Sequence, residues 1–453
     1  MSNEELKEYI LSNRESIIED LSGFIEIPSV SSDKENVDKA LDYALNLGKK
    51  MGFNTYAACN HQVGVIEVGE GEETVGILSH VDVVPPGDIE DWNTDPFTMV
   101  IKDGKLFGRG TMDDKGAIII CLYAMKAVVD SGKPLKKKIQ MILGTQEEVD
   151  WVDMKQYVSE YPLPDYGFTP DGEFPLCNIE KGGMDIPMYF PREEESHQDG
   201  KYITGIDAGT ATNGVPGKAK AVISKYENGK EIEREEIVVM GKGVHSCQPE
   251  KGINAIFSLA EKVESMNLCE NQLLRLLMMT RENMEDIFGK KLGIYSKSET
   301  YNGEFVHRNA FAPTLFKMDE ERILIHVNVR FAYGTETDDV LDAFGRIASQ
   351  YGGKLGKVDV LPAVYISKDR PFMKAFAQAY EEGCGRENEF VLAYGGSYAK
   401  AIPNIVSWGP IFPGDEDTCH ENNEYITIDS LLDNGKIFAI ALNKVVLSEN
   451  KYK

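Results

Sequence analysis

The chain has 453 residues, 74 of them acidic and 48 basic, and its formal net charge is -26. A chain of this length exceeds what one hydrophobic core usually supports, so we expect two domains. The negative surface repels phosphate backbones and anionic lipid, which argues against nucleic acid or a membrane as a partner. No apolar run approaches the roughly 18 residues that a membrane helix needs.

The cysteines and the N-terminus bear on the compartment. The seven cysteines form no C-x-x-C pair, and their odd number is typical of reduced thiols. The first 27 residues have amphipathic-helix patterning and lack the uninterrupted apolar core of a signal peptide. We therefore expect a cytoplasmic protein.

The first part of the chain alternates strand and helix patterns. Short apolar runs at 63–68, 75–78 and 139–143 predict strands, and the longer pattern at 115–129 predicts a helix. This alternation indicates an α/β domain, in which ligands bind at the ends of the strands.

The pattern changes near Gly182 and returns near Val364. Between these points strands alternate with helices in the order of a sheet covered on one face, as in a ferredoxin-like unit. The predicted strands are 184–190, 237–240, 323–331 and 358–361, and the predicted helices are 252–266 and 337–351. A helix at 371–382 then resumes the first pattern, so the middle region is predicted to be an insertion in the first domain.

Five separated segments each carry a residue of metal-binding type. Two divalent metals that share a carboxylate can make bound water nucleophilic at neutral pH, which a scattered His or Asp cannot do. The segments are Ser79–Asp82, Gly108–Gly116, Gln146–Glu148, Thr169–Asp171 and Asp417–His420. The sequence therefore predicts an enzyme with a two-metal hydrolytic centre.

The first two segments have specific features of metal sites. His80 and Asp82 follow a strand pattern at i and i+2, so both point to one face, and Asp82 can accept the second ring N–H of a metal-bound His80. Asp113 and Asp114 precede a helix, where an N-cap would explain one carboxylate. The other carboxylate could bridge two metals, which requires both of its oxygens to be free to reach metals roughly 3.5–4 Å apart.

The other three segments allow structural and functional interpretations. Glu147 and Glu148 at a strand end point in different directions, so one can bind metal while the other acts as general base. Asp171 between Pro170 and Gly172 could be a turn residue, and His420 an ordinary surface histidine. If none of these residues bound metal, a structural interpretation such as a cap, a turn or a surface position would have to hold for all five segments at once.

Several strings carry a family resemblance over residues 15 to 430. They are HVDVVPPG (80–87), DGKLFGRGTMDDKG (103–116), GTQEE (144–148), TPDGEFP (169–175) and FPGDEDTCHENNEYI (412–426). They resemble the co-catalytic metallopeptidase family of carnosinase, aminoacylase and succinyl-diaminopimelate desuccinylase, especially its bacterial peptidase V (Xaa-His dipeptidase) branch. The resemblance implies an α/β fold, with a two-metal aminopeptidase-like catalytic domain at 1–182 and 365–453 and an inserted α+β ferredoxin-like lid at 183–364.

The resemblance also implies which residues hold two divalent metals, zinc or manganese, with cobalt also compatible. One metal would be held by His80, Asp113 and Asp171. The other would be held by Asp113, Glu148 and His420. Asp82 would orient His80, Glu147 would be the general base, and the peptide bond after Asp113 would be cis.

Further matches imply residues that contact substrate. His245 would stabilise the oxyanion, Asn213 would contact substrate, and Arg330 would bind its terminal carboxylate as a planar fork. Without the resemblance, Arg330 would be a solvent-facing residue of a strictly alternating strand. The family's G-G-G-T-Y-A-R is here YGGSYAK (394–400), which implies substrate contacts from Gly395, Gly396 and Ser397. It also places Tyr394 and Lys400 where Gly and Arg are usual.

The resemblance implies a cytosolic dipeptidase that acts on short peptides with a free C-terminal carboxylate, through a metal-bridging hydroxide and a glutamate base. The same site would also serve an N-acyl amino acid deacylase or a desuccinylase. A catalytically silent peptide-binding relative is disfavoured, because it has no reason to keep every ligand. In this branch a large lid goes with a monomer, although a dimer stays open.

Overall fold

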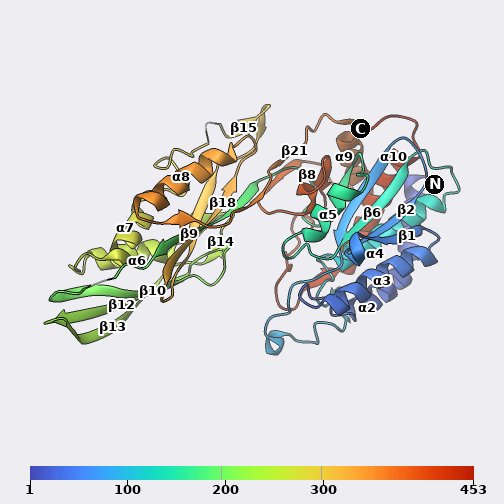
Figure 1. The fold of residues 1–453 in the computed structure, drawn as a ribbon. Coiled ribbons are helices and arrows are strands. Elements are labelled where there is room, and N and C mark those ends of the chain that lie inside the picture. Colours follow the sequence, from blue (N-terminus) through green and yellow to red (C-terminus); the bar gives the residue numbers. More distant parts are fainter. Residues whose placement is uncertain (195, 297) are drawn as a thin grey trace. The chain divides into compact units, whose positions relative to one another are not determined.

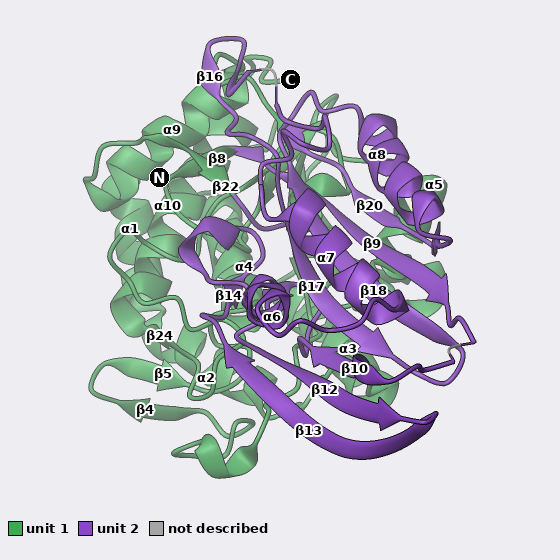
Figure 2. Cartoon of the chain, turned by 90° about the vertical axis from the view of Figure 1, so that its left-hand side faces the viewer, with its two compact units in different colours: residues 1–178, 365–393, 397–453 green, residues 179–364, 394–396 purple. Residues whose placement is uncertain are grey.

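The structure, a computed structural model, describes residues 1–194, 196–296 and 298–453. The chain forms two compact units, shown in different colours in Figure 2. The first comprises residues 1–178, 365–393 and 397–453, and the second comprises 179–364 and 394–396. No helix among the described residues is both long enough and apolar enough to cross a membrane.

The first unit is built around a mixed nine-stranded sheet (Figure 1). Its order is β1 (Asn54–Ala58), β2 (Val63–Val68), β6 (Lys138–Gly144), β3 (Thr74–His80), β7 (Tyr166–Thr169), β23 (Ile405–Ser407), β8 (Leu176–Glu180) and β21 (Val364–Tyr365), with β22 (Phe390–Ala393) beside β8. The four strands β6, β3, β7 and β23 are parallel, and β3 and β6 are buried over all but their first residue. This burial explains why these strands appear in the sequence as continuous apolar runs.

Helices pack around this sheet and against each other. They are α1 (Asn3–Ser12), α2 (Arg14–Ile25), α3 (Lys34–Lys50), α4 (Lys115–Val129), α5 (Val152–Glu160), α9 (Pro371–Cys384) and α10 (Ile428–Val446). Helix α4 packs against β3 and α10 and is apolar on all sides, as expected for a helix inside the core. The buried Lys115 amine at its start donates hydrogen bonds to the carbonyls of Phe24 and Ile27, which ties α4 to the end of α2.

A small sheet joins two segments that are distant in sequence. It has the order β24 (Tyr425–Thr427), β5 (Lys105–Phe107) and β4 (Val100–Lys102). Strand β5 leads into the glycine-rich segment that begins at Gly108, and β24 follows the segment of His420. The antiparallel pairing of β24 with β5 therefore brings both segments to one place.

The second unit contains an eight-stranded sheet whose strand pairs are all antiparallel. Its order is β13 (Lys230–Met240), β12 (Lys218–Glu227), β10 (Gly200–Ala208), β17 (Ala310–Met318), β18 (Arg322–Phe331), β9 (Gly182–Pro191) and β19 (Lys354–Leu355), with β20 (Asp359–Leu361) beside β9. Helices α6 (Ala255–Glu264), α7 (Gln272–Met284) and α8 (Thr337–Gln350) share one core with the sheet.

Strand β18 shows how this core forms. Its residues Ile323, Ile325, Val327 and Val329 are buried in the same cluster as the apolar faces of the three helices. The helices therefore cover the face to which these alternating residues point. The predicted α/β fold with an inserted α+β unit is confirmed, although the second sheet is larger than a ferredoxin-like unit requires.

The core of the second unit gives a stability prediction. Phe344 on α8 is fully buried and lies edge-on to Phe311, with ring centroids 5.5 Å apart. Phe344→Ala should lower the free energy of unfolding by about 3–5 kcal/mol, because it leaves a cavity. Denaturant unfolding would measure the loss. Ile232→Ala, at a position 51% exposed in the same unit, should change it by less than about 0.5 kcal/mol.

Candidate active site

Three predicted residues of the site lie at the carboxyl ends of the central parallel strands. His80 is the last residue of β3, Glu147 follows β6, and Asp171 follows β7. Strands β6 and β7 flank β3 on its two sides. Parallel strands end at the same edge of a sheet, and this edge is where α/β folds bind ligands.

Asp113 lies between the two predicted histidine ligands. Its Oδ1 is 3.0 Å from His80 Nε2, and its Oδ2 is 3.0 Å from His420 Nε2. One carboxylate that directs each oxygen to a different imidazole has the arrangement expected of a bridging ligand. The peptide bond between Asp113 and Asp114 is cis, as predicted.

Asp114 does not act as the side-chain cap that a purely structural interpretation required. Its carboxylate makes no capping hydrogen bond to α4. It instead accepts hydrogen bonds from the hydroxyl of Ser79 and from the backbone N–H of His80. Asp114 therefore supports the end of β3, on which His80 stands.

One further carboxylate lies beside each histidine. Asp171 Oδ2 is 3.9 Å from His80 Nε2, and Glu148 Oε2 is 3.1 Å from His420 Nε2. The structure thus brings all five predicted ligands together in two groups that share Asp113. His420 has a φ of 65°, and such left-handed backbone in a residue with a side chain is enriched at functional sites.

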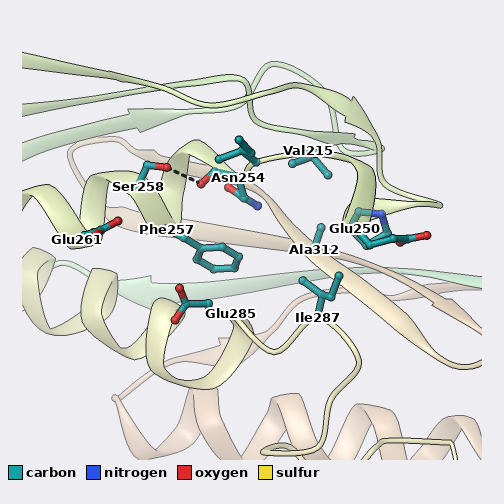
Figure 3. A pocket seen from close by; sticks show the side chains of 12 residues that line it. Val215, Glu250, Asn254, Phe257, Ser258, Glu261, Glu285, Ile287 and Ala312 are labelled. Carbon is teal, nitrogen blue, oxygen red and sulfur yellow. Dashed lines mark hydrogen bonds between the residues drawn. The ribbon is translucent and has the colours of Figure 1, made fainter.

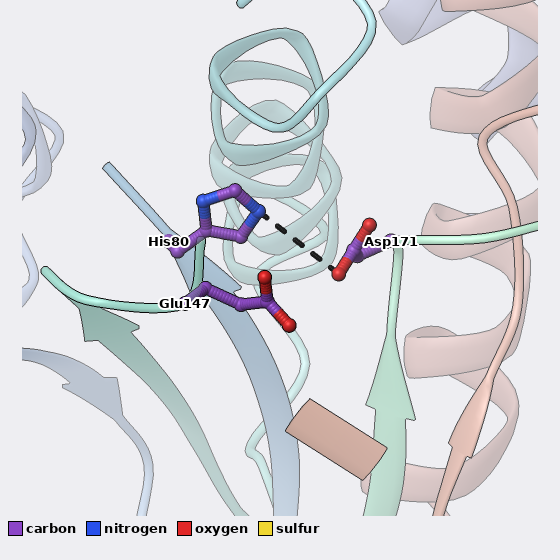
Figure 4. Close-up of side chains that lie close together, drawn as sticks. All are labelled: His80, Glu147 and Asp171. Carbon is purple, nitrogen blue, oxygen red and sulfur yellow. Dashed lines mark ion pairs between the residues drawn. The ribbon is translucent and has the colours of Figure 1, made fainter. Parts of the chain in front are cut away.

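Glu147 also reaches this cluster. His80, Glu147 and Asp171 each offer a ligand atom within 4.8 Å of the others, as do His80, Asp113 and Glu148 (Figure 4). In Figure 4 the carboxylate of Glu147 lies below the line that joins His80 to Asp171. This geometry is compatible with Glu147 as a ligand or as a base beside the ligands, and the predicted role as base stays a prediction.

The cluster contains more acidic than basic side chains. Burial, followed by the charge of Asp113, raises the pKa of Asp171 to about 7, and burial with the charge of Asp171 raises that of Glu147. Hydrogen bonds to Asp113 and Glu148 raise the pKa of His420 to about 11. The imidazoles neutralise only part of the negative charge, so carboxylates repel each other in a buried space. Two divalent cations would remove this repulsion.

Two buried atoms of the cluster also have the properties of metal ligands. His80 Nε2 and Asp113 Oδ1 are buried and lie 3.0 Å apart, and neither has a further hydrogen-bond partner within the described ranges of the chain. Buried polar atoms of this kind normally have a partner, and a metal ion is one. Imidazole nitrogen with carboxylate oxygen suits zinc, manganese or cobalt. The residues present therefore fit a two-metal centre.

Asp82 lies against the second ring nitrogen of His80, and its role in orienting the imidazole stays a prediction. His80 Nδ1 lies 2.9 Å from the backbone oxygen of Asp82 and 3.5 Å from its carboxylate Oδ1. The carboxylate also accepts hydrogen bonds from the backbone N–H groups of Glu147 and Glu148, at 3.2 and 3.3 Å, and from the hydroxyl of Ser31. Asp82 thus holds both the histidine and the Glu147–Glu148 turn.

Asp153 and Tyr398 support the same turn and were not identified from the sequence. The buried Asp153 carboxylate accepts hydrogen bonds from the backbone N–H groups of Thr145 and Gln146 and from the Tyr398 hydroxyl. Four consecutive amides, from Thr145 to Glu148, are therefore held by two buried carboxylates. An acidic residue among apolar neighbours in α5 was the available signal.

The predicted substrate residues Asn213, His245 and Arg330 lie in the second unit and share a hydrogen-bond network. His245 in β14 (Val244–His245) pairs with Gly214 in β11 (Gly214–Val215). The next residue, Ser246, donates its N–H to the Asn213 carbonyl and its hydroxyl to Asn328 Oδ1. Arg330 Nε donates to the same Asn328 oxygen at 3.2 Å.

The surroundings of Arg330 are buried, which argues against the alternative interpretation of Arg330 as a solvent-facing residue of β18. His326 and Asn328 on that side are 5% and 1% exposed. Burial lowers the pKa of Arg330 and lowers that of the nearby buried Lys181 to about 8. Lys181 Nζ lies 5.7 Å from the centre of the Tyr394 ring. Lys181 has no motif that would have marked it in the sequence.

The remaining predicted substrate residues are Gly395, Gly396 and Ser397. Gly395 and Gly396 are exposed and belong to the second unit. Ser397 is buried in the first unit, and its hydroxyl accepts a hydrogen bond from the Ala399 N–H at the start of a 3₁₀ turn. The structure therefore gives Ser397 a capping role.

A cavity of about 470 Å³ lies within the second unit (Figure 3). Phe257, Ile287 and Val215 form apolar parts of its lining, and Glu261 and Glu285 add acidic groups. None of the predicted metal or substrate residues lines it. The candidate active site is therefore located by the convergence of ligand atoms.

The fold and the site define a class, that of hydrolases with a two-metal centre at the end of a parallel sheet and an inserted α+β unit. The chain belongs to the peptidase family M20/M25/M40, whose model matches residues 76–444. The predicted family and the predicted metallopeptidase class are thereby confirmed.

Individual relatives agree with this assignment. YtjP of Bacillus subtilis (strain 168), provisionally named a dipeptidase, is 32% identical over 96% of this chain and 98% of its own. Two solved structures share the fold at low identity. The Saccharomyces cerevisiae dipeptidase Dug1p has a TM-score of 0.64 and 14% identity over 99% of both chains. Human carnosine dipeptidase 1 has a TM-score of 0.62 and 16% identity over 98% of both chains.

The charge imbalance of the cluster leads to a prediction about metal binding. Zn²⁺ or Mn²⁺ added to metal-stripped protein should raise the thermal unfolding temperature, because a ligand of the folded state stabilises it by about 2.7 kcal/mol at 100 times its Kd. Circular dichroism during heating would measure the shift. The variant Asp113→Ala should show almost none of it, and an equal shift in that variant would place the metals elsewhere.

Proposed function

We propose that this chain is a cytoplasmic, metal-dependent dipeptidase that hydrolyses short peptides with a free C-terminal carboxylate. The observation that carries the proposal is the Asp113 carboxylate between His80 and His420, with a further carboxylate beside each imidazole. The similarity to YtjP over nearly the whole of both chains supports the choice of substrate class.

The proposed centre holds two divalent metals, zinc or manganese, with cobalt as a further candidate. His80, Asp113 and Asp171 would hold one, and Asp113, Glu148 and His420 the other. When bound, the metals supply a lowered pKa of water and polarisation of the peptide carbonyl.

Glu147 is proposed as the general base. Its carboxylate takes the proton from the attacking water and then gives it to the nitrogen of the leaving amine as the C–N bond breaks. This role requires an aimed side chain, and the amides of its turn are held by Asp82 and Asp153. His245 is proposed to donate a hydrogen bond to the oxyanion.

Arg330 is proposed to bind the C-terminal carboxylate of the substrate. Its Nε is occupied by Asn328, which fixes the guanidinium plane. A planar, always charged fork is the best match to a carboxylate. Asn213 and His245 belong to the same network, so the residues that would contact substrate are positioned together. Gly395, Gly396 and Ser397 remain proposed substrate contacts.

A single substitution tests the role of Glu147. Glu147→Gln keeps the size of the side chain and removes the base, so kcat should fall by about 10²–10⁴ with metal content unchanged. Steady-state kinetics with elemental analysis of the metals would measure both. Loss of metal from this variant would make Glu147 a ligand, a role that its place beside His80 and Asp171 allows.

The substrate class can be tested at Arg330. Arg330→Ala should weaken transition-state binding of a free dipeptide by about 2–5 kcal/mol, because the substrate carboxylate loses its charge-assisted partner. The effect should almost vanish for a C-terminally amidated dipeptide, which the wild type should cleave poorly. Comparison of kcat/KM for both substrates measures this.

Two further variants act as controls for Arg330. Arg330→Lys should restore part of the loss, since it keeps the charge without the fork. Arg322→Ala removes an exposed arginine from the same strand and should leave kcat/KM unchanged. Equal cleavage of free and amidated dipeptides by the wild type, with equal losses in Arg330→Ala, would make Arg330 structural.

The same metal centre would also serve an N-acyl amino acid deacylase or a desuccinylase. A panel of dipeptides, tripeptides and N-acyl amino acids, assayed with each metal added back to stripped protein, separates these activities. We further propose that the chain is a monomer. We also propose that it binds neither nucleic acid nor membrane, in keeping with the net charge of -26.

A further inference from the structure

The proposed centre depends on where the Asp113 carboxylate is held relative to His420. Asp113 lies on the glycine-rich segment that starts at Gly108, and His420 lies on a segment more than 300 residues later. Neither segment is a helix or a strand, so its backbone amides have no partners in regular secondary structure. Something else must therefore fix the two segments against each other.

Glu424 makes the connecting contacts. Its carboxylate is fully buried and accepts hydrogen bonds from the backbone N–H groups of Gly110, Met112 and Asp113, at 3.0, 2.9 and 3.2 Å to Oε1. Its own carbonyl accepts the N–H of Gly108 at 3.0 Å. One residue of the His420 segment thus binds four amides of the Asp113 segment.

Arg109 completes this arrangement. Its Nη1 donates to Glu424 Oε2 at 2.7 Å, and its side chain is 1% exposed. The guanidinium also lies 5.3 Å from the centre of the Trp92 ring. The buried carboxylate therefore has a cation and the Gly110 N–H on Oε2 and three backbone amides on Oε1, which makes its position strongly determined.

We propose that Glu424, held by Arg109, is a positioning residue that sets the orientation of the bridging carboxylate of Asp113 relative to His420. The inference rests on the proposed two-metal function. Because Asp113 is shared by both ligand groups, a displaced Asp113 weakens both metal sites together. A merely structural glutamate would leave metal binding unchanged in any variant that folds.

The test uses the full-length protein, stripped of metal, with Co²⁺ as the probe. Glu424→Gln keeps the size of the side chain but replaces one acceptor oxygen with an NH₂ donor that faces other donors. We expect both Co²⁺ ions to bind about 10–100-fold more weakly, as is usual for residues that support metal ligands. The visible absorption of Co²⁺, which reports ligand geometry, should also change. Calorimetric titration and absorption spectra measure these effects.

Glu73→Gln is the matched control. Glu73 is also a buried glutamate of the first unit, and it accepts hydrogen bonds from the N–H groups of Tyr452 and Lys453, away from the metal ligands. Its replacement should lower the unfolding temperature and leave the Co²⁺ affinity and spectrum as in the wild type. The two variants together separate loss of stability from loss of metal geometry.

Arg109→Lys provides a milder second variant, which keeps the charge and loses the fork. It should shift the Co²⁺ affinity in the same direction by a smaller factor. Wild-type affinity and spectrum in every folded variant of Glu424 and Arg109 would overturn the inference, even if Glu424→Gln failed to fold. A wild type that binds no Co²⁺ would instead overturn the proposed function, and the inference with it.

Discussion

The position of the Asp113 carboxylate between His80 and His420 is the constraint on which the rest of the site depends. A single carboxylate can serve two metals only if each oxygen faces its own group of ligands, and here each oxygen lies 3.0 Å from a different imidazole. The cluster concentrates negative charge in a buried space, where like charges repel strongly. Divalent cations would offset that charge, so the ligand geometry and the proposed chemistry of hydrolysis would follow from the same electrostatic requirement.

The sheet supplies part of this geometry and buried carboxylates supply the rest. Parallel strands β6, β3 and β7 end side by side, which brings His80, the Glu147–Glu148 turn and Asp171 to one edge. Beyond the strand ends, the backbone has unpaired amides that need acceptors. Asp82, Asp153 and Glu424 accept hydrogen bonds from several of these amides each. A buried charge is tolerated when it is this fully hydrogen-bonded.

In the second unit an uncharged side chain, rather than a carboxylate, holds neighbouring segments together. Asn328 accepts hydrogen bonds from both Ser246 and Arg330, so the strand β18 and the turn that follows His245 share one polar centre. The helices pack on the opposite face of the sheet, so the proposed substrate contact Arg330 lies on the face that they leave uncovered. The proposed substrate contacts and the metal-binding cluster thus lie in different units, each with its own core.

The sequence by itself determined the fold class, because buried parallel strands leave continuous apolar runs. Together with the family resemblance it also indicated the five segments that converge on the cluster, because metal chemistry restricts residue types. Only the tertiary structure decided that the Asp82 backbone, rather than its carboxylate, lies nearest His80, since amides from a turn 65 residues away occupy that carboxylate. It also revealed Asp153, whose Tyr398 partner is 245 residues away. Hydrogen bonds between such distant residues leave no periodic signal, because they form only when the chain is folded.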